Sequence, residues 1–475
     1  MPGLRVIFNR KLLVIFFMAL VIRGILFVQV IKHPQVIHQP DSRMYVSLAQ
    51  GLMQHGTLCY PGMPDQPGVE KMPGYPVFLF LVIALFGNSF LAVIIIQIII
   101  DSLSCVLISY LGEMVLEGAG FLSGILASVN LCMITYSHFI LNDSLFLFVF
   151  LVLLILMFRF LREPGWRFVV FLGAGLGIAA FIRPVVLYLP IFLIPSFFLY
   201  LVIKLHVSFL MAASKVILMG LIFIISLSPW FGRNYVYYGR LNLTAQTGGY
   251  ALQYVIPFVW QYSKGTSFIE GFKKTNEEFQ EKAKKKQLDF KMANPFEVSD
   301  LQVEMAIDYL KREPKMAIIK AWIFGVVKNL FAPAIIDLSY LLDIERPHFF
   351  YTEGKTLIER ALNFMKNMQG FFGWAVIGSL ITLILMRFIQ LWGFIQAIRI
   401  NLWKGLLLCL IVFYFLLVSG PIGYAKYRLP FEPIMIILMA IGIRSLSATL
   451  YNPSWGGNSL LRKSNLKEVK RIDAL

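Results

Sequence analysis

Long apolar runs, separated by shorter connections that carry charges, set the pattern of this sequence. A helix needs about 20 mainly apolar residues to cross the hydrocarbon core of a bilayer. The runs that approach this length are residues 12–31, 89–112, 119–139, 144–162, 167–182, 185–203, 215–231, 371–390, 404–422 and 429–446. The pattern therefore predicts an all-α polytopic membrane protein with about ten transmembrane helices.

Two further apolar runs are not counted as spans. Residues 76–86 are too few to cross, and residues 315–331 contain Lys320 and Lys328, so we expect both runs to lie at the membrane interface. With the N-terminus in the cytoplasm, this count leaves Arg159, Arg162 and many later basic residues on the cytoplasmic side, as the positive-inside rule requires. Counting either run as a span would move the later charges outside. Because Arg23 interrupts the first run, we expect an uncleaved span there rather than a signal peptide.

The predicted connections divide the chain into four parts. Residues 1–231 would form an N-terminal catalytic transmembrane module, including an outer loop at 32–88 with juxtamembrane helices. Residues 232–370 are the one long polar stretch, and they would form a small, mainly helical domain on the outer face. Residues 371–446 would supply the C-terminal transmembrane helices, and residues 447–475 a basic cytoplasmic tail. No internal repeat of the kind found in many transporters is evident.

Composition agrees with a membrane protein and changes how the charge is interpreted. Hydrophobic residues make up 58% of the 475 residues and charged residues only 15%, which excludes a disordered chain and argues against a water-soluble enzyme. The net charge of +17 would suggest nucleic acid on a soluble protein. On a membrane protein it is better explained by cytoplasmic anchoring and by attraction to anionic lipid or phosphate, so we expect no nucleic-acid partner. The four cysteines form no pattern typical of a disulfide framework or a metal site.

Charged residues gather in the connections on the predicted outer face. The residues are Asp41 and Lys71 in the first of these connections, Asp143, Arg183 and Arg233 in the next three, and Lys426 and Arg428 in the last. Any one of these is most often a snorkelling or capping residue, because charges near a bilayer are costly to bury. The set is more informative than its members. Arginine and lysine bind a lipid-linked phosphate, and a carboxylate can activate an acceptor hydroxyl; glycosyl transfer from a sugar-phosphate lipid needs both.

Five motifs around these residues occur in a characteristic order between about residues 12 and 446. They are Asp41-Ser-x-x-Tyr45-x-x-Leu48-Ala49; Lys71-Met-Pro-Gly-Tyr75-Pro76; a glycine-rich span that ends in Arg183-Pro184; Pro229-Trp-x-x-Arg233-Asn234-Tyr235, followed by Gly239-Arg240 and Gly248-Gly249; and Tyr427-Arg-Leu-Pro-x-Glu-Pro433. In these motifs the chain resembles membrane glycosyltransferases of the C-type fold. The most similar branch is the bacterial one related to protein O-mannosyltransferases and aminoarabinose transferases, which use polyprenyl-phosphate sugars.

The resemblance implies roles for particular residues. Asp41 would be the general base, and Asp143 would occupy a position where the family usually has glutamate, so its reach is one methylene shorter. Lys71 replaces the family's common arginine and loses the bidentate fork, which makes Arg183, Arg233 and Arg428 better candidates for the donor phosphate. The other residues expected to bind donor or substrate are Arg43, Tyr45, Tyr75, Asn234 and Tyr427.

The sequence predicts no certain cofactor. Some relatives bind a divalent metal at the outer carboxylates, and Asp41 and Asp143, with His55 and His138, could hold one here, although no ligand spacing supports this. Two other polar residues had two interpretations each. Asp101, inside an apolar run, could mark an ion pathway or pair with Arg23, and Glu432 could favour a helix dipole or contact the donor.

The leading hypothesis is an inverting glycosyltransferase of the hexosyl- or pentosyltransferase class, at the outer face of the bacterial inner membrane, with both termini in the cytoplasm. Its expected partners are a polyprenyl-phosphate sugar donor, membrane lipid and an acceptor (lipid, glycan or protein) that the sequence does not identify. The alternatives are a secondary transporter or lipid flippase, against which the missing repeat argues, and an outer-face glycan ligase or polymerase, which would share the same charges.

Overall fold

The computed structural model describes residues 10–288, 293–344, 352, 354, 357–367 and 370–451. Its first half consists of helices and one short hairpin. These are α1 (Arg10–Lys32), η2 (Pro34–Ile37), α2 (Pro40–His55), β1 (Cys59–Tyr60), β2 (Met63–Pro67), α3 (Gly74–Phe86), α4 (Phe90–Val115), α5 (Gly120–Ser128), α6 (Leu131–Tyr136), α7 (Asp143–Arg162), α8 (Trp166–Ile182), η3 (Pro184–Tyr188), α9 (Leu189–Leu199), η4 (Tyr200–Lys204) and α10 (Phe209–Tyr238). The two strands pair antiparallel.

The second half is helical throughout the part that is described. It comprises α11 (Gln246–Tyr250), η5 (Ala251–Val255), α12 (Ile256–Ser263), α13 (Phe268–Lys285), α14 (Pro295–Arg312), α15 (Lys315–Phe331), α16 (Ile335–Leu341), α17 (Leu357–Asn367), α18 (Gly370–Ile400), α19 (Leu402–Val418), η7 (Ala425–Arg428) and α20 (Glu432–Tyr451). The predicted all-α architecture is therefore confirmed.

By length and composition, six of the described helices could cross a membrane. They are α1, α4, α7, the segment Pro184–Lys204, α10 and α18, and the bent pair α15 and α16 would make a seventh. Helices α3, α8 and α19 are apolar but shorter. The number of about ten spans stays a prediction, as does the interfacial placement of residues 76–86 and 315–331.

One predicted span is not a continuous helix. Residues 119–139 form α5 and α6, which are separated at Val129 and Asn130. The side chain of Asn130 accepts a hydrogen bond from the Met133 N–H and so caps α6, while its amide donates to Glu432 at 2.8 Å. The break occurs because this polar side chain is held by a distant helix, which local hydrophobicity does not reveal.

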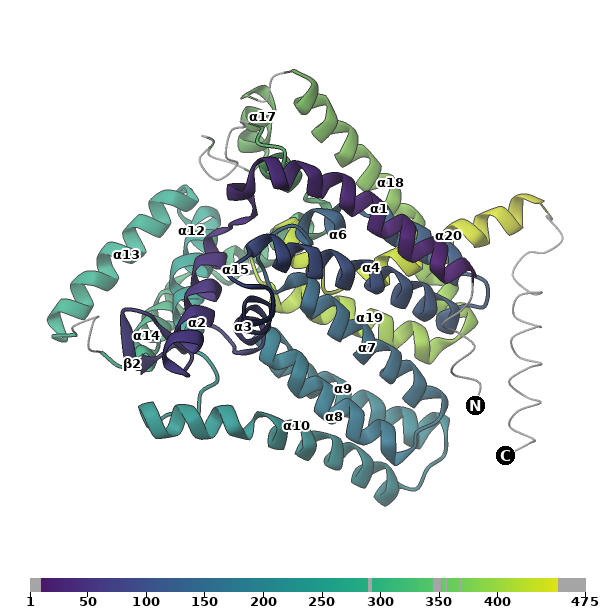
Figure 1. The fold of residues 1–475 in the computed structure, drawn as a ribbon, viewed down its shortest axis with the longest axis horizontal. Coiled ribbons are helices and arrows are strands. Elements are labelled where there is room, and N and C mark those ends of the chain that lie inside the picture. The colour runs from purple at the N-terminus through teal and green to yellow at the C-terminus, as the bar shows by residue number, and fades with distance from the viewer. Residues whose placement is uncertain are drawn as a thin grey trace.

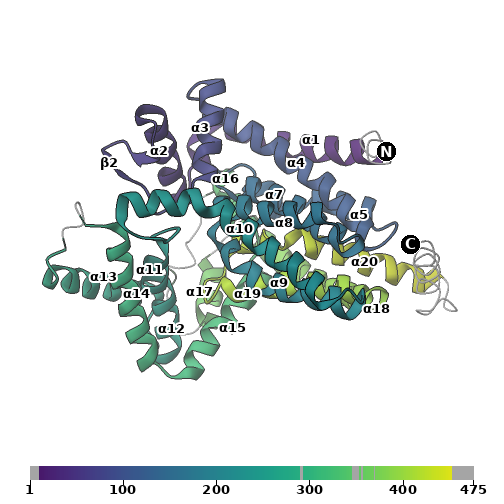
Figure 2. The same cartoon turned by 90° about the horizontal axis from the view of Figure 1, so that it is seen from below.

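The helices form an elongated bundle with a second, smaller group of helices at one end. In both ribbon views α11 to α14 lie at the end where α2 and β2 are found, whereas α1 begins and α20 ends at the opposite end (Figure 1, Figure 2). The bundle shares one large buried apolar cluster. The group around η5, α12, α13 and α14 has its own small core, built on Leu252, Ile256, Trp260 and Phe279.

Small residues allow the closest helix contacts in the bundle. A Cβ atom at Gly173 in α8 would lie 2.6 Å from the main-chain oxygen of Met219 in α10, and one at Gly177 would lie 1.8 Å from Ser226 Oγ. In a lipid environment such close packing replaces the hydrophobic driving force between helices. The close packing of α8 against α10 thus explains the glycines in the span before Arg183.

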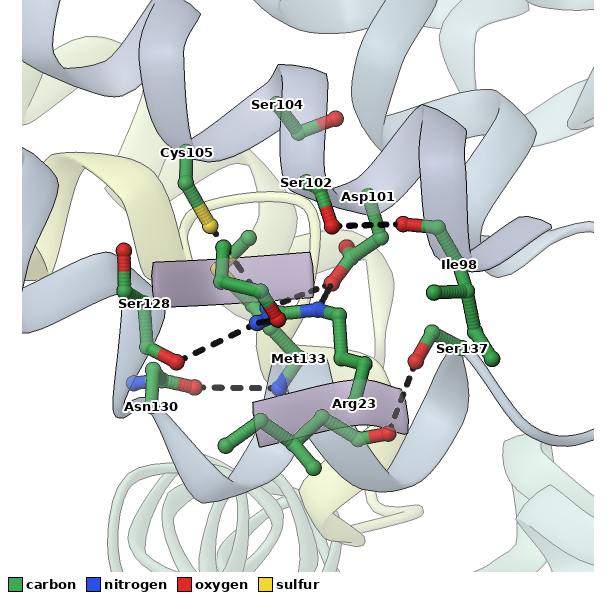
Figure 3. A network of polar contacts seen from close by, with 12 residues as sticks. Arg23, Ile98, Asp101, Ser102, Ser104, Cys105, Ser128, Asn130, Met133 and Ser137 are labelled. Carbon is green, nitrogen blue, oxygen red and sulfur yellow. Dashed lines mark hydrogen bonds and ion pairs between the residues drawn. The ribbon is translucent and has the colours of Figure 1, made fainter. Parts of the chain in front are cut away.

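A buried ion pair ties α1 to α4 (Figure 3). The Arg23 Nε donates to Asp101 Oδ2 at 2.6 Å, and Arg23 Nη1 donates to the Ser128 carbonyl at 3.1 Å. Both charged side chains are almost fully enclosed. Of the two interpretations of Asp101, the structure confirms the one in which Arg23 is its partner.

Candidate active site

The first carboxylate of the site, Asp41, lies in the first turn of α2. Helix α2 begins with a capping box between Gln39 and Ser42, and negative charge is favourable at this helix end. The Ser42 hydroxyl also donates to the Ile140 carbonyl at 2.8 Å, and the Ile140 N–H donates to the Ile37 carbonyl at 3.0 Å. These two hydrogen bonds hold the start of α2 against the residues just before α7, where the second carboxylate is found.

That second carboxylate is Asp143, in the first turn of α7. Its side chain is completely buried, and Arg183 Nη1 lies 3.1 Å from its Oδ1. The contact is an ion pair rather than an aligned hydrogen bond, because neither oxygen of Asp143 accepts a hydrogen bond from the described residues. Arg183 follows the last turn of α8 in an extended conformation, as a residue before proline prefers.

Lys426, in η7, joins the two carboxylates. Its Nζ lies 3.2 Å from Asp41 Oδ2 and 3.9 Å from Asp143 Oδ2. Lys71 Nζ lies 3.0 Å from Asp41 Oδ1. We call these five residues the charged cluster: Asp41, Lys71, Asp143, Arg183 and Lys426. With three cations and two anions, the cluster carries a formal charge of +1.

Opposite charges in the cluster favour the ionised forms of Asp41 and Lys426. Burial alone would raise the pKa of Asp41, but the ammonium groups of Lys426 and Lys71 outweigh it and hold that pKa well below its usual range. Burial likewise opposes the charge on Lys426, and the carboxylates of Asp143 and Asp41 nevertheless raise its pKa. Asp41 and Lys426 are therefore both ionised at neutral pH.

Two tyrosines of the motifs support Lys71. The Lys71 ammonium lies 5.5 Å from the centre of the Tyr45 ring, and Tyr45 packs edge-on against Tyr75. The Tyr75 hydroxyl donates to Gln97 Oε1 at 2.6 Å. Tyr75 is fully buried, so the structure places it behind the cluster and not in contact with open space.

The other predicted residues lie outside the cluster. Arg428 is buried, donates to Glu432 Oε2 at 2.6 Å and contacts the carbonyls that end α15. The side chain of Glu432 contacts Arg428 and Asn130. Its two considered roles, at the helix dipole or at the donor, stay predictions. Lys426 and Arg428 point in different directions because residues two apart on a 3₁₀ helix differ by about 240°.

Arg233 and Asn234 hold connections together. Arg233 Nη2 donates to the carbonyls of Leu58 and Gly68 at 3.2 and 3.1 Å, and its guanidinium lies 4.2 Å from the Trp230 ring centre. Asn234 donates to the Asn242 carbonyl at 2.6 Å. These contacts fix the connection between α2 and α3 against the end of α10.

Two candidates remain near the helix termini that carry the site. Arg43 is exposed on α2. Tyr427 follows Lys426 in η7, and burial raises its pKa although Lys426 and Arg183 act in the opposite direction. Tyr427 is thus a neutral phenol beside the cluster.

An open cavity of about 700 Å³ adjoins the cluster. Asp41 and Lys71 line it, together with Tyr60, Gly68 and Glu70 from the connection between α2 and α3. The rest of the described lining consists of residues between Tyr238 and Gln302. The side chain of Asp41 is 42% exposed whereas that of Asp143 is enclosed, so of the two carboxylates in the cluster Asp41 is the one that a molecule in the cavity can reach.

Sequence reasoning placed Lys426 among the charges of the predicted outer face but gave it no role in the site, and it did not select Glu70 or the cavity residues between Tyr238 and Gln302. Lys426 and Glu70 each neighbour a residue that was selected, Arg428 or Lys71, so proximity to the motifs was the available signal. Among the described residues no group of three His, Cys, Asp or Glu could hold a metal ion. Both ring nitrogens of His138 lie near main-chain carbonyls, at 2.8 and 3.0 Å. A metal at Asp41 and Asp143 stays a prediction, and the positive charge between them is that of Lys426.

Comparison with solved structures returns membrane glycosyltransferases. An Archaeoglobus fulgidus oligosaccharyltransferase, tethered to an acceptor peptide with an NVT sequon, is 12% identical, with 96% of this chain and 53% of that chain covered and a TM-score of 0.45. ArnT from Cupriavidus metallidurans bound to undecaprenyl phosphate is 14% identical, with 91% and 77% covered and a TM-score of 0.35. The chain thus spans about half the length of the oligosaccharyltransferase. These TM-scores are too low to assign a site or a substrate.

A family model gives the more direct comparison. No curated protein sequence matches significantly. Residues 65–232 match the model described as dolichyl-phosphate-mannose-protein mannosyltransferase. This segment contains Lys71, Asp143 and Arg183 of the charged cluster. The match confirms the resemblance that the motifs indicate: over residues 65–232 the chain is similar to the dolichyl-phosphate-mannose-protein mannosyltransferases.

Proposed function

We propose that the protein transfers a sugar from a polyprenyl-phosphate donor to a hydroxyl of an acceptor on the outer face of the membrane, with inversion at the anomeric carbon and Asp41 as general base. The observation that carries the proposal is the charged cluster at the cavity. It offers a reachable carboxylate, Asp41, beside two lysine ammonium groups within hydrogen-bond distance. The carboxylate that would act as the base and the cations that would bind the phosphate thus lie side by side.

The two carboxylates would have different roles. Asp143 is enclosed and paired with Arg183 and Lys426, so it would orient these cations rather than receive a proton. Asp41 faces the cavity, and its carboxylate would accept the acceptor's hydroxyl proton. The acceptor oxygen would bond to the anomeric carbon while the bond from that carbon to the phosphate oxygen breaks, and polyprenyl phosphate would leave with the electron pair.

The lysines would couple donor binding to activation of the base. With Lys71 and Lys426 on its oxygens, Asp41 is a weak base, because its pKa is held low. The cluster's formal charge of +1 complements the single negative charge of a phosphodiester. A donor phosphate that attracts Lys71 or Lys426 would leave Asp41 with fewer cations and raise its basicity. The resting site would then avoid proton transfer until the donor is present.

The test is the release of polyprenyl phosphate. Purified protein in lipid nanodiscs is given a panel of polyprenyl-phosphate monosaccharides together with a total membrane extract as the source of acceptor. Asp41→Asn should lower the release rate by about 10²-fold or more, the usual effect of losing a general base. Asp65→Asn, at an exposed acid of β2, is the matched control and should leave the rate unchanged. Full activity of Asp41→Asn would remove Asp41 as the base.

A further inference from the structure

The part of the cavity lining contributed by residues between Tyr238 and Gln302 has an unusual chemistry. Among the described residues that line the cavity, those between Tyr238 and Gln302 include no acid or base. They include instead the carboxamides of Gln246, Gln253 and Gln302 and the rings of Tyr250 and Tyr254. The charged side and the neutral side of the cavity are therefore distinct.

Gln302 combines low exposure with a place in the cavity lining. It belongs to α14, its exposed fraction is only 8%, and it lines the cavity. Its side chain makes no hydrogen bond to the described residues. The amide atoms of Gln302 are not among the fully enclosed polar atoms that lack a partner, so they are open to the cavity, where they can donate to and accept from a bound group.

A second carboxamide converges on the same point. A Cβ atom built at Gly249 would lie 3.8 Å from Gln302 Oε1 and 4.0 Å from Gln253 Oε1. Gly249 thus leaves open space beside two amide oxygens. The neighbouring Gly248 permits the close contact of α11 with α14, because a Cβ atom there would lie 2.2 Å from the Ser299 carbonyl oxygen.

We propose that the wall formed by Gln253, Gln302 and Gly249, with the Tyr250 and Tyr254 rings, binds a neutral carbohydrate of the acceptor, whose hydroxyl is thereby presented toward Asp41. Carboxamides both donate and accept, which suits vicinal hydroxyls. Tyr250 and Tyr254 lie nearly parallel, with ring centres 6.3 Å apart, and offer flat apolar surface to the C–H face of a sugar ring. The cavity volume of about 700 Å³ is within the range of about 300–1,000 Å³ usual for ligand sites.

Other acceptor classes suit the wall less well. An anionic lipid headgroup or acidic sugar would require cations, which bind such groups by charge-assisted hydrogen bonds, and the described part of this wall has none. An extended peptide would add to a strand edge. Strand β2 has the sequence Met-Pro-Asp-Gln-Pro, so two of its five residues lack the N–H donor that such pairing needs.

The experiment measures binding in the absence of donor, by saturation-transfer NMR on the full chain in nanodiscs. The probes are chitotriose, maltotriose and mannotriose as neutral sugars, trigalacturonate as an anionic sugar, and a short serine-containing peptide. At least one neutral trisaccharide should bind. Gln302→Ala should weaken it about tenfold, the effect of one or two lost hydrogen bonds. Gly249→Ala should also weaken it, because its methyl group enters the cavity at ordinary contact distance from both amides.

Gln280→Ala is the matched control, since Gln280 lies on α13 and does not line the cavity. Binding of the peptide or trigalacturonate in preference to every neutral sugar would overturn the inference, as would unchanged affinity in both Gln302→Ala and Gly249→Ala. The inference rests on the proposed function only in naming the sugar as acceptor. If sugars bind but no polyprenyl phosphate is released from any donor, the proposed function fails and the sugar site stands. If release occurs but no neutral sugar binds, only the inference fails.

Discussion

Replacement of Lys426 by methionine removes the cation between the two carboxylates and keeps most of its volume. At an effective dielectric constant of about 20, unit charges separated as Lys426 is from Asp41 (3.2 Å) and Asp143 (3.9 Å) attract by about 5 and about 4 kcal/mol. Desolvation of Lys426 and screening at the 42% exposed Asp41 cancel much of this attraction. Asp143 also keeps Arg183 at 3.1 Å. We therefore expect a net loss of about 1–3 kcal/mol in the free energy of unfolding.

The same substitution should impair donor binding. The formal charge of the cluster falls from +1 to 0, and one charge-assisted contact to phosphate, about 1.5–3 kcal/mol, is lost. The KM for a polyprenyl-phosphate sugar should therefore rise about 10- to 100-fold. Lys426→Arg should recover most of the affinity because it keeps the charge.

The assay measures the donor KM and the apparent Tm of each variant in the same nanodiscs. Lys264→Met is the control, since Lys264 forms an ion pair of 2.9 Å with Glu313 in the outer segment. It should lower the apparent Tm without changing the donor KM. A Lys426→Met protein whose donor KM stays within twofold of the parent would refute the reasoning that this cation serves the phosphate.

Three further predictions concern stability. Arg23→Met should lower the free energy of unfolding by about 3–5 kcal/mol because it leaves Asp101 buried without a cation. In thermal unfolding, the double variant Arg23→Met with Asp101→Asn should regain most of this loss. A double variant as unstable as Arg23→Met alone would argue against the ion pair. Gly173→Ala should destabilise by about 1–3 kcal/mol through its clash with an α10 carbonyl, whereas Gly24→Ala, with open space around it, should lower the apparent Tm little. Asp41 has a lowered pKa in the folded state, so the stability it contributes is present above the unfolded pKa of about 3.9 and is lost as pH falls through the folded value. The Tm difference between the parent and Asp41→Asn should thus be constant from about pH 5 to 8 and shrink below about pH 4; a difference that already shrinks between pH 7 and 5 would contradict this.

Local pattern was enough to predict the fold class and much of the site. Apolar length predicted the helices of the bundle. The motifs selected Asp41, Lys71 and Arg183, and the charged connections added Asp143; the structure brings these four residues together around Lys426. Local pattern could not show that Lys426, and not Arg428, contacts the carboxylates. Lys426 reaches the carboxylates because of the direction in which η7 is held between α19 and α20, and that direction is a tertiary property.

Long-range contacts account for the other differences. At the interruption of residues 119–139, Asn130 donates a hydrogen bond to Glu432, which lies 302 residues later in the chain. A hydropathy pattern contains no information about such a contact. The neutral cavity wall depends on the close contact of α11 with α14, which Gly248 permits. Arg233 and Arg428 were selected as cations for phosphate, and the structure shows both engaged by main-chain carbonyls.

The central claim is that the protein breaks the bond between sugar and lipid phosphate, and a doubly labelled donor tests it directly. The donor carries one isotope in the sugar and another in the phosphate, and both are followed in nanodiscs supplied with the membrane extract. The proposed function predicts that free polyprenyl phosphate and a new sugar-containing product appear in equal amounts, and that both are lost in Asp41→Asn. Translocation of the intact donor across a proteoliposome membrane, with both labels still joined, would contradict it and would favour a flippase.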